Sequence, residues 1–315
     1  MLLTQFDFHY DFVLGTSLEL RIDAAKEQDA LAAEAVVLAE IERLEPILSG
    51  WSPSSELNRW LDRRGVDALV SADLANVLSS AAVWRTLTGG AFNPAAAAVI
   101  DALSSPLSHD ASAERIRVLL SEISEPLWEV SRNTSIARCL TPHAISLDAL
   151  AKGYIVRAAA AEARKVAGVH AVLLNIGGDL QHFGPQPITV GIVDPFAPAD
   201  NARPITAVQI CNEALATSGG YRRGCHVGDR FLSHIVDPRS GSTAGDIVSA
   251  SVIAPDCDTA DALSTAFSVL SPGESLALAD SLTGVGCLII QATGVHTVNR
   301  AWGARACEPR LASIH

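Results

Sequence analysis

The sequence predicts an α+β fold. Segments with strand character and segments with helix character are interspersed, without the regular strand–helix–strand alternation of a doubly wound sheet. Of the 315 residues, 49% are hydrophobic and 18% are charged, which is enough apolar material for a sizeable core and argues against disorder. We find no internal repeat, low-complexity tract or linker rich in proline and glycine. We therefore expect one domain over residues 1–315.

The first half of the chain predicts one strand followed mainly by helices. Residues 14–22 (LGTSLELRI) alternate between apolar and polar, which indicates a half-buried strand. A helix that begins at Ser71 or Asp73 is expected to end at TGGAFNP (88–94), because two glycines and a proline stop it there. The other elements expected in this half are helices over 24–48 and 111–121 and a hairpin-like region over 127–147.

The second half predicts more strands. A strongly helical stretch covers 146–165, with Ser146 or Asp148 as its N-cap, and a buried strand over 170–180 ends in a glycine turn. The remaining expected elements are strands over 188–195, 205–210, 231–238, 248–255 and 285–294 and helices over 259–270 and 273–281.

Charge and cysteine usage narrow the function classes. The net charge is −12 and no basic run is longer than two arginines, so a duplex nucleic acid is not an expected partner. The six cysteines are widely separated and form no C-x-x-C motif. In a chain of this length, this spacing predicts reduced and mostly buried thiols.

The chain shows no targeting or membrane segment. Its first residues, MLLTQFDFHYDFVLG, lack a basic n-region, a sustained apolar run and a lipidation cysteine, and no segment approaches 18 consecutive apolar residues. We expect a soluble, cytoplasmic protein without a membrane span. A periplasmic location after removal of a signal peptide stays open.

The stretch TADALSTAFSVL (259–270) combines an apolar helix face with a polar pair. Leu263 and Phe267 have helical spacing, and Asp261 and Thr265 lie four residues apart on another face. One interpretation is structural: Asp261 in the first turn suits the helix dipole, and Thr265 bonds back to a helix carbonyl. The alternative is a hard cation such as Mg²⁺, which takes oxygen ligands.

Three further motifs allow both a structural and a functional interpretation. Lys152 could extend from an amphipathic helix to solvent, or bind a phosphate near the helix N-terminus. Gly153 costs about 1 kcal/mol inside a helix relative to alanine, which indicates close approach of another group. NIGGDL (175–180) predicts a plain β-turn or close backbone approach to a planar ligand. His234, on a predicted strand, is either a hydrogen-bonded core residue or an acid/base near neutral pH.

The order of these motifs resembles that of the ApbE-type FAD:protein FMN transferases. The resemblance covers residues 14–299. The motifs that carry it are LGT (14–16), LSGWSPSSELNRW (48–60), TGGAFNP (88–94), LDALAKGY (147–154), LLNIGGDL (173–180), ATSGGY (216–221), SHIVDPRSG (233–241) and ADALSTAF (260–267).

The resemblance implies a single α+β, T-fold-like domain of mixed, largely antiparallel sheets packed with helices. It also implies Mg²⁺-dependent transfer of FMN from FAD to a Thr or Ser hydroxyl of an acceptor protein, with release of AMP. We therefore predict a transferase with Mg²⁺ as cofactor and with FAD and an acceptor protein as partners. Two alternatives stay open: a Mg²⁺-dependent FAD pyrophosphatase that gives FMN and AMP, and a non-catalytic FAD-binding protein.

The resemblance also assigns roles to residues. Asp261, Thr265 and the backbone carbonyl of Ala149 match the metal ligands, Lys152 matches a residue at the FAD phosphates, and His234 matches the residue that moves protons. Lys152, Asp261 and His234 are thus the expected catalytic residues. The other positions that it assigns to the flavin nucleotide are Leu14, Trp51, Ala91, Phe92, Asn93, Ser146, Gly178 and Ile235.

Three residues depart from the family pattern. Ser146 stands where an aspartate is usual, with an acid displaced to Asp148, and Asn93 stands where an aspartate is common. Arg157 occupies a position where an acid is frequent. We expect these departures to alter contacts with FAD.

Overall fold

The fold is known from a computed structural model. It describes residues 3–103, 109–197, 203–219, 224–227, 230–233, 236–243 and 245–308. An eight-stranded sheet forms its centre, and every registered strand pair in this sheet is antiparallel. In spatial order its strands are β1 (Thr4–Val13), β2 (Thr16–Ala24), β6 (Val169–Ile176), β7 (Asp179–Phe183), β10 (Ala214–Ser218), β13 (Ile247–Ala254), β14 (Gly286–Gln291) and β15 (His296–Val298).

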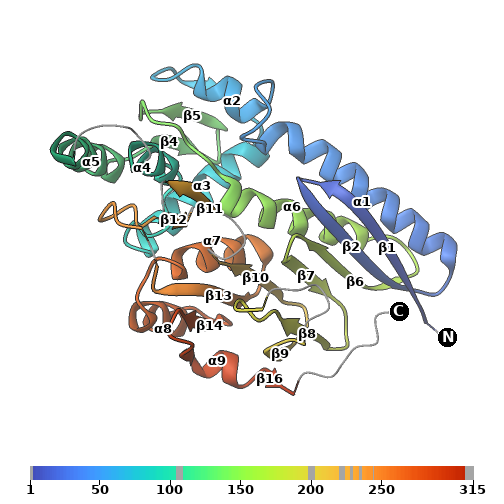
Figure 1. The fold of residues 1–315 in the computed structure, drawn as a ribbon. Helices are drawn as coiled ribbons and strands as arrows, with labels where there is room; N and C mark the ends of the chain where they lie inside the picture. Colours follow the sequence, from blue (N-terminus) through green and yellow to red (C-terminus); the bar gives the residue numbers. More distant parts are fainter. Residues whose placement is uncertain are drawn as a thin grey trace.

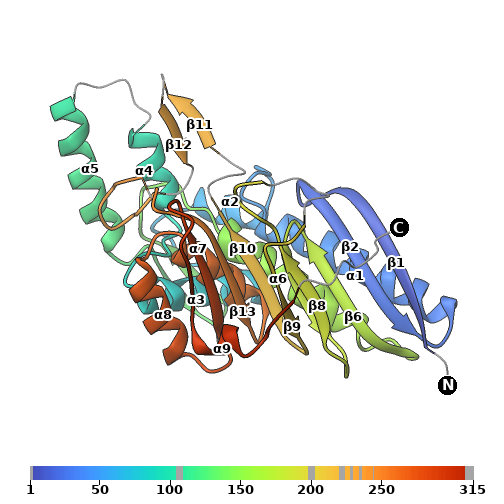
Figure 2. The ribbon, with the colours of Figure 1, turned by 60° about the horizontal axis from the view of Figure 1, so that its bottom comes forward.

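Three long helices cover one face of this sheet. They are α1 (Glu27–Leu48), α6 (Asp148–Ala163) and α7 (Cys257–Phe267). Alternate residues of β2, including Leu18, Leu20 and Ile22, point to the helices and are almost fully buried. This is the period-two burial that the sequence predicts for residues 14–22. In Figure 2 the strands lie in front, and α1 and α6 lie behind them.

A smaller apolar layer covers the opposite face. Its three-stranded sheet has the order β16 (Ala306–Cys307), β9 (Thr206–Ile210) and β8 (Ile188–Ile192), and α9 (Arg300–Gly303) packs beside it. The cluster between the layers joins alternate residues of the large sheet to Trp302. Its fully buried members are Leu180, Ile192, Val208, Ile210, Leu215, Ile253, Leu288, Ile290 and Trp302.

The other elements lie mostly away from the two termini (Figure 1). The helices here are α2 (Glu56–Leu61), α3 (Ala72–Leu87), α4 (Ala96–Leu103), α5 (His109–Ser124) and α8 (Pro272–Ser281). A three-stranded sheet has the order β3 (Ala68–Leu69), β5 (Ile136–Cys139) and β4 (Trp128–Ser131), and β11 (Gly224–Val227) pairs with β12 (Arg230–Ser233).

The predicted α+β class and the antiparallel pairing are confirmed, while two local predictions are wrong. We did not predict β1, although Phe6, Phe8 and Tyr10 alternate with polar residues and pack against the core. The N-cap of α6 is Leu147, not Ser146 or Asp148, and Ser146 Oγ instead accepts a hydrogen bond from the Asp148 N–H at 3.1 Å. A hydroxyl two residues before a helix satisfies an end amide without being the cap.

Cysteines and membrane character follow the predictions where the structure describes them. The five described cysteines are free thiols; Cys139, Cys257 and Cys287 are buried, and Cys211 and Cys307 are partly exposed. The side chain of Cys225 lies outside the described residues. Among the described helices, none combines the length and the apolar character needed to cross a membrane.

Candidate active site at the α6–α7 crossing

At Gly153 the backbones of α6 and α7 approach each other closely. A Cβ atom at this position would lie 2.4 Å from the carbonyl oxygen of Cys257, so no larger residue fits without moving one helix. The predicted close approach to Gly153 is therefore real, and the group that approaches is the first turn of α7. The crossing brings two segments more than one hundred residues apart into direct contact.

Asp261 points into this crossing. Its side chain is buried, with 4% exposure, and its Oδ2 accepts a hydrogen bond from the Gly153 N–H at 3.2 Å. In an α-helix the same N–H faces the carbonyl four residues earlier, which is that of Ala149. The Asp261 carboxylate therefore meets α6 at the amide that follows Ala149 by one helical turn.

The helix-dipole interpretation of Asp261 is wrong. The first turn of α7 begins at Cys257, its acidic residue is Asp258, and Asp261 follows as the fifth helical residue. Asp256 is the N-cap and accepts a hydrogen bond from the Thr259 N–H at 2.9 Å. Asp261 therefore lies beyond the end amides that a dipole argument requires.

Thr265 faces a neighbouring strand. Its Oγ1 lies 3.4 Å from the Ser218 hydroxyl at the end of β10, and that hydroxyl is also 2.8 Å from Ser264 Oγ. Ser264 and Ser268 are the residues that bond back to helix carbonyls, each at 3.0 Å. Thr265 thus lies on the side of α7 that carries Asp261, one turn further on.

The electrostatics of Asp261 fit a bound cation. Burial raises the pKa of its carboxyl, while the charge of Lys152 and the Gly153 amide act in the opposite direction. A carboxylate removed from water needs a compensating positive charge. The Asp261 carboxylate, the Thr265 hydroxyl and the Ala149 carbonyl would together form an all-oxygen donor set of the kind that suits Mg²⁺.

Lys152 forms an ion pair with Asp179 at the start of β7. Asp179 is almost fully buried, whereas the lysine side chain keeps 28% exposure, so the pair lies between the core and the surface. On the same face of β7, Gln181 Oε1 accepts a hydrogen bond from the Cys257 N–H at 3.0 Å. Strand β7 therefore fixes Lys152 on α6 and the beginning of α7 with two alternate residues.

Asp179 is a site residue that our sequence analysis missed. The GGD motif drew attention to its glycines, and no role was assigned to the acid. A signal was available: Asp179 and Gln181 have strand spacing and are polar in an otherwise buried segment.

The two glycines before Asp179 form a tight turn. Gly177 and Gly178 have φ values of +63° and +98°, the left-handed conformation that a two-residue hairpin requires. The β-turn interpretation is thus confirmed. The Gly177 N–H donates to the Ser17 carbonyl at 3.1 Å, which places this turn near Leu14. A Cβ on Gly178 would meet open space, so a ligand can approach there.

Trp51 projects from a loop beside the N-terminus of α6. Its side chain is 86% exposed. Asn58 on α2 holds the loop, because its Nδ2 donates to the carbonyls of Gly50 and Ser52 at 3.1 and 2.8 Å. A Cβ on Gly50 would lie 3.6 Å from Asp148 Oδ1. The loop that carries this exposed indole therefore contacts the first residue of α6 through Gly50.

The 88–94 loop approaches α6 from another side. The Ser146 N–H donates to the Pro94 carbonyl at 2.9 Å. Ala91 and Phe92 are buried, so a nucleotide at this loop would contact their backbone rather than their side chains. Asn93 donates to the Ile123 carbonyl at 3.2 Å and accepts from the Ala95 N–H at 3.0 Å. Its amide thus has partners within the fold.

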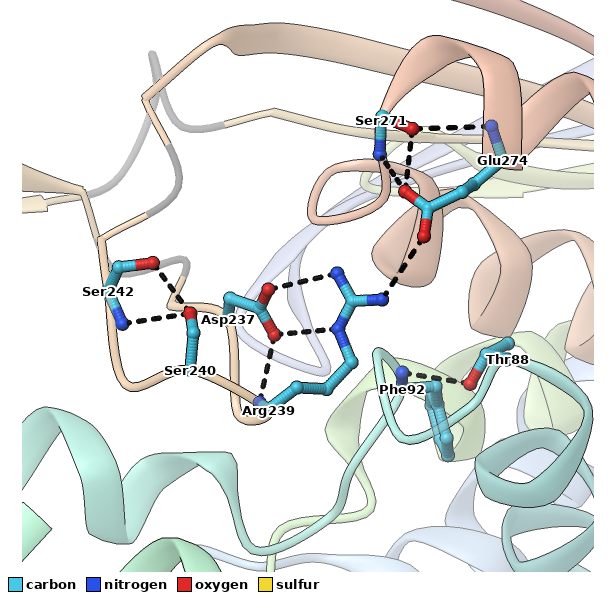
Figure 3. A network of polar contacts seen from close by, with 8 residues as sticks. All are labelled: Thr88, Phe92, Asp237, Arg239, Ser240, Ser242, Ser271 and Glu274. Carbon is cyan, nitrogen blue, oxygen red and sulfur yellow. Dashed lines mark hydrogen bonds and ion pairs between the residues drawn. The ribbon is translucent and has the colours of Figure 1, made fainter. Parts of the chain in front are cut away.

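Arg239 fixes the DPRSG turn (237–241) near the 88–94 loop (Figure 3). Its Nε and Nη2 each donate to Asp237 at 2.9 Å, and Nη1 lies 3.6 Å from Glu274 on α8. A Cβ on Gly90 would contact Arg239 Cγ at 3.6 Å. His234 and Ile235, predicted just before this turn, lie outside the described residues.

Arg157, one of the departures, has a partner in α7. Its Nε donates to Asp258 Oδ1 at 2.5 Å, and the guanidinium lies 5.1 Å from the ring centre of Tyr154. An arginine at this position therefore complements an acid on the neighbouring helix.

Comparison with known families matches residues 14–289 to the ApbE family. The chain belongs to the ApbE family. It is 29% identical over 272 residues to the FAD:protein FMN transferase of Rhodobacter capsulatus, covering 82% of this chain and 50% of that protein. It is 26% identical over 311 residues to the Treponema pallidum protein of the same name, covering 89% and 83%. The chain thus spans about half the length of the Rhodobacter relative.

Solved ApbE structures share the fold. The ApbE protein from Thermotoga maritima matches with a TM-score of 0.81 at 24% identity, over 97% of this chain and 100% of that one. The flavin transferase ApbE from Vibrio cholerae matches with a TM-score of 0.76 at 20% identity, over 96% and 100%. The predicted family and fold are confirmed, and the prediction of a transferase agrees with the names of these relatives. The roles of individual site residues stay predictions.

Proposed function

We propose that this ApbE chain is a Mg²⁺-dependent FAD:protein FMN transferase. It transfers FMN from FAD to a Thr or Ser hydroxyl of an acceptor protein and releases AMP. The names of its relatives support the transfer of FMN from FAD. The observation that carries the metal assignment is the buried Asp261 carboxylate, which lies at the Gly153 amide one turn after Ala149, with Thr265 one turn further along α7.

The acceptor hydroxyl attacks the phosphorus atom of the FMN half of FAD. A new O–P bond forms, the bond to the bridging oxygen breaks, and AMP leaves with that electron pair. The hydroxyl proton passes to a positioned base, for which we propose His234. Water in place of the acceptor gives FMN and AMP, so one site accounts for transfer and for hydrolysis.

The chain's own residues bind and orient the dinucleotide. Lys152, held by Asp179, places a positive charge where phosphate oxygens bind. Trp51 provides an exposed aromatic face for stacking. Asp261, Thr265 and the Ala149 carbonyl would hold Mg²⁺, which withdraws electron density from the pyrophosphate when it is bound.

We also infer that residues 1–315 form one domain. The large sheet contains strands from Thr4 near one end of the chain to Val298 near the other, which supports this inference. Helices from both halves of the chain, α1 and α7, pack on the same face of it.

The experiment compares Asp261→Asn with Asp256→Asn. Both variants remove one negative charge from α7, and asparagine at position 256 keeps the N-cap. We expect Asp261→Asn to lower AMP release from FAD by at least about 100-fold, because it removes a charged ligand. Asp256→Asn should retain most activity.

Chromatography of FAD, FMN and AMP, with and without an acceptor, measures the outcome. AMP release by Asp261→Asn at the wild-type rate would refute the metal assignment. Rapid AMP release without acceptor, together with no transfer of FMN when an acceptor is present, would favour the pyrophosphatase. Tight FAD binding with neither reaction would select the non-catalytic alternative.

A further inference from the structure

The α6–α7 crossing is held by a second polar contact besides the Gly153–Asp261 hydrogen bond. Arg157 lies one turn after Gly153 on α6, and Asp258 lies almost one turn before Asp261 on α7. Their Nε and Oδ1 atoms are 2.5 Å apart. The two contacts therefore lie next to each other along the interface of α6 and α7, where the two helices run in opposite directions.

This ion pair is partly shielded from solvent. The side chains of Arg157 and Asp258 are 34% and 14% exposed. Asp256, the N-cap of α7, adds a further negative charge near the guanidinium. A charge pair of this kind is strongly destabilised when one partner is removed, because the other charge stays buried without compensation.

Arg157 is itself fixed by a network that reaches two other helices. Its guanidinium lies over the ring of Tyr154, at 5.1 Å from the centroid. The Tyr154 hydroxyl donates to Asp73 Oδ1 at 2.7 Å, and Asp73 Oδ2 accepts from Arg43 on α1 at 2.7 Å. The position of the guanidinium is therefore set by α1, α3 and α6 before it meets α7.

We propose that the Arg157–Asp258 ion pair is a positioning clamp for the metal site. It sets the spacing of α6 and α7, and with it the separation of the Ala149 carbonyl from the Asp261 carboxylate. Arg157 is a positioning residue, because it acts through Asp258 and α7. This inference rests on the proposed function, since it concerns the same metal ligands.

The sensitivity of the site to this spacing follows from the chemistry of the ion. Mg²⁺ requires nearly ideal octahedral geometry at short ligand distances. A ligand pair contributed by two helices meets this requirement only while both helices keep their relative position. Residues that orient metal ligands typically change metal affinity by 10- to 100-fold when they are replaced.

The test measures binding of Mn²⁺, a paramagnetic substitute for Mg²⁺, by electron paramagnetic resonance in the absence of FAD. We expect Arg157→Gln to raise the half-saturating Mn²⁺ concentration roughly tenfold. Arg157→Lys keeps the charge and should recover part of this loss. The exchange Arg157→Asp with Asp258→Arg restores an ion pair of reversed polarity and should return binding to within about threefold of wild type.

The matched control is Arg305→Gln. Arg305 forms an ion pair with Glu213, and the two side chains are 23% and 19% exposed, on the opposite side of the large sheet. This control should lower thermal stability without changing Mn²⁺ binding. Unchanged binding in Arg157→Gln, or an equal loss in Arg305→Gln, would overturn the clamp.

Asp261→Asn separates the clamp from the proposed function. Loss of Mn²⁺ binding in this variant shows that the signal reports the α6–α7 site. Wild-type binding in Asp261→Asn would overturn the metal assignment, and the clamp with it. If Asp261→Asn loses binding while the Arg157 variants do not, the metal assignment stands and the clamp alone fails.

Discussion

The two faces of the large sheet use the same strands but bury different chemistry. On the helix face, β7 presents Asp179 and Gln181, which contact Lys152 and the backbone of α7. On the opposite face, the same strand presents Leu180 to a cluster of aliphatic side chains around Trp302. Both faces are well buried. Since the cluster around Trp302 packs closely with apolar side chains, close packing in this fold does not require buried carboxylates.

This difference separates stability from function. A buried carboxylate costs free energy of folding unless it is compensated, and Asp179 and Asp261 depend on Lys152 and the Gly153 amide for this compensation. Their position at the α6–α7 crossing fits binding of charged groups. Residues around Trp302 should thus govern stability, and residues at the crossing should govern binding.

The largest effect on stability is expected from Trp302→Ala. Trp302 is 1% exposed, so its removal should lower the free energy of unfolding by about 3–5 kcal/mol. Urea denaturation measures this loss. Mn²⁺ binding by the folded variant should be unchanged, and a weakened metal site would break the separation between the two faces.

A matched pair of glycines should give an intermediate effect. A Cβ would lie 2.4 Å from the Cys257 carbonyl oxygen at Gly153, and 3.0 Å from the Trp302 amide nitrogen at Gly286. Overpacking of this kind costs about 1–3 kcal/mol. Both alanine variants should be destabilised, but only Gly153→Ala should lose AMP release. Equal AMP release from the two variants would contradict the role of the crossing.

The smallest effect concerns pH. Burial raises the pKa of Asp258 from its usual 3.8 to about 6, against the opposing effect of Arg157. The folded state therefore holds this proton more tightly than the unfolded state, and the contribution to stability is present below about pH 4 and lost as the pH rises through 6.

Asp258→Asn should flatten the pH dependence of the free energy of unfolding between pH 4 and 6. The slope should change by at most one proton. Asp67→Asn is the control. The hydrogen bond and ion pair with Arg138 lower the pKa of Asp67, so any effect of its titration on the free energy of unfolding falls below pH 4. A steeper pH dependence of the free energy of unfolding in Asp258→Asn would contradict the raised pKa assigned to Asp258.

Local sequence patterns predicted the helices and strands well where the apolar residues followed a single period, either that of a strand or that of a helix. The strand over 14–22 and the helices that carry Lys152 and Asp261 appear where the apolar spacing indicated them. The N-terminal strand has the same alternation in Phe6, Phe8 and Tyr10, so the same rule predicts it. The N-cap of α6 was misplaced because Ser146 and Asp148 are both good capping residues, whereas the cap is Leu147, which lies between them and makes no side-chain cap hydrogen bond.

The site was predicted in part. Motif order and helical spacing singled out Asp261, Thr265 and Lys152. The structure places Asp261 and Lys152 at the α6–α7 crossing and Thr265 one turn further along α7, beside Ser218, and their roles stay predictions. Asp179 was missed because its meeting with Lys152 depends on how β7 lies against α6, which no local pattern encodes. Gly153 was noticed, but its neighbour Cys257 is distant in sequence and could not be named.

The hydrogen bond between Gly153 and Asp261 spans 108 positions of the chain. Four strands of the central sheet, β6, β7, β10 and β13, lie between these two groups in the chain, and α7 carries the second of them. A growing or refolding polypeptide therefore cannot complete the proposed ion-binding centre until α7 has joined the sheet. Uptake of a divalent cation at this centre would mark a late stage of maturation.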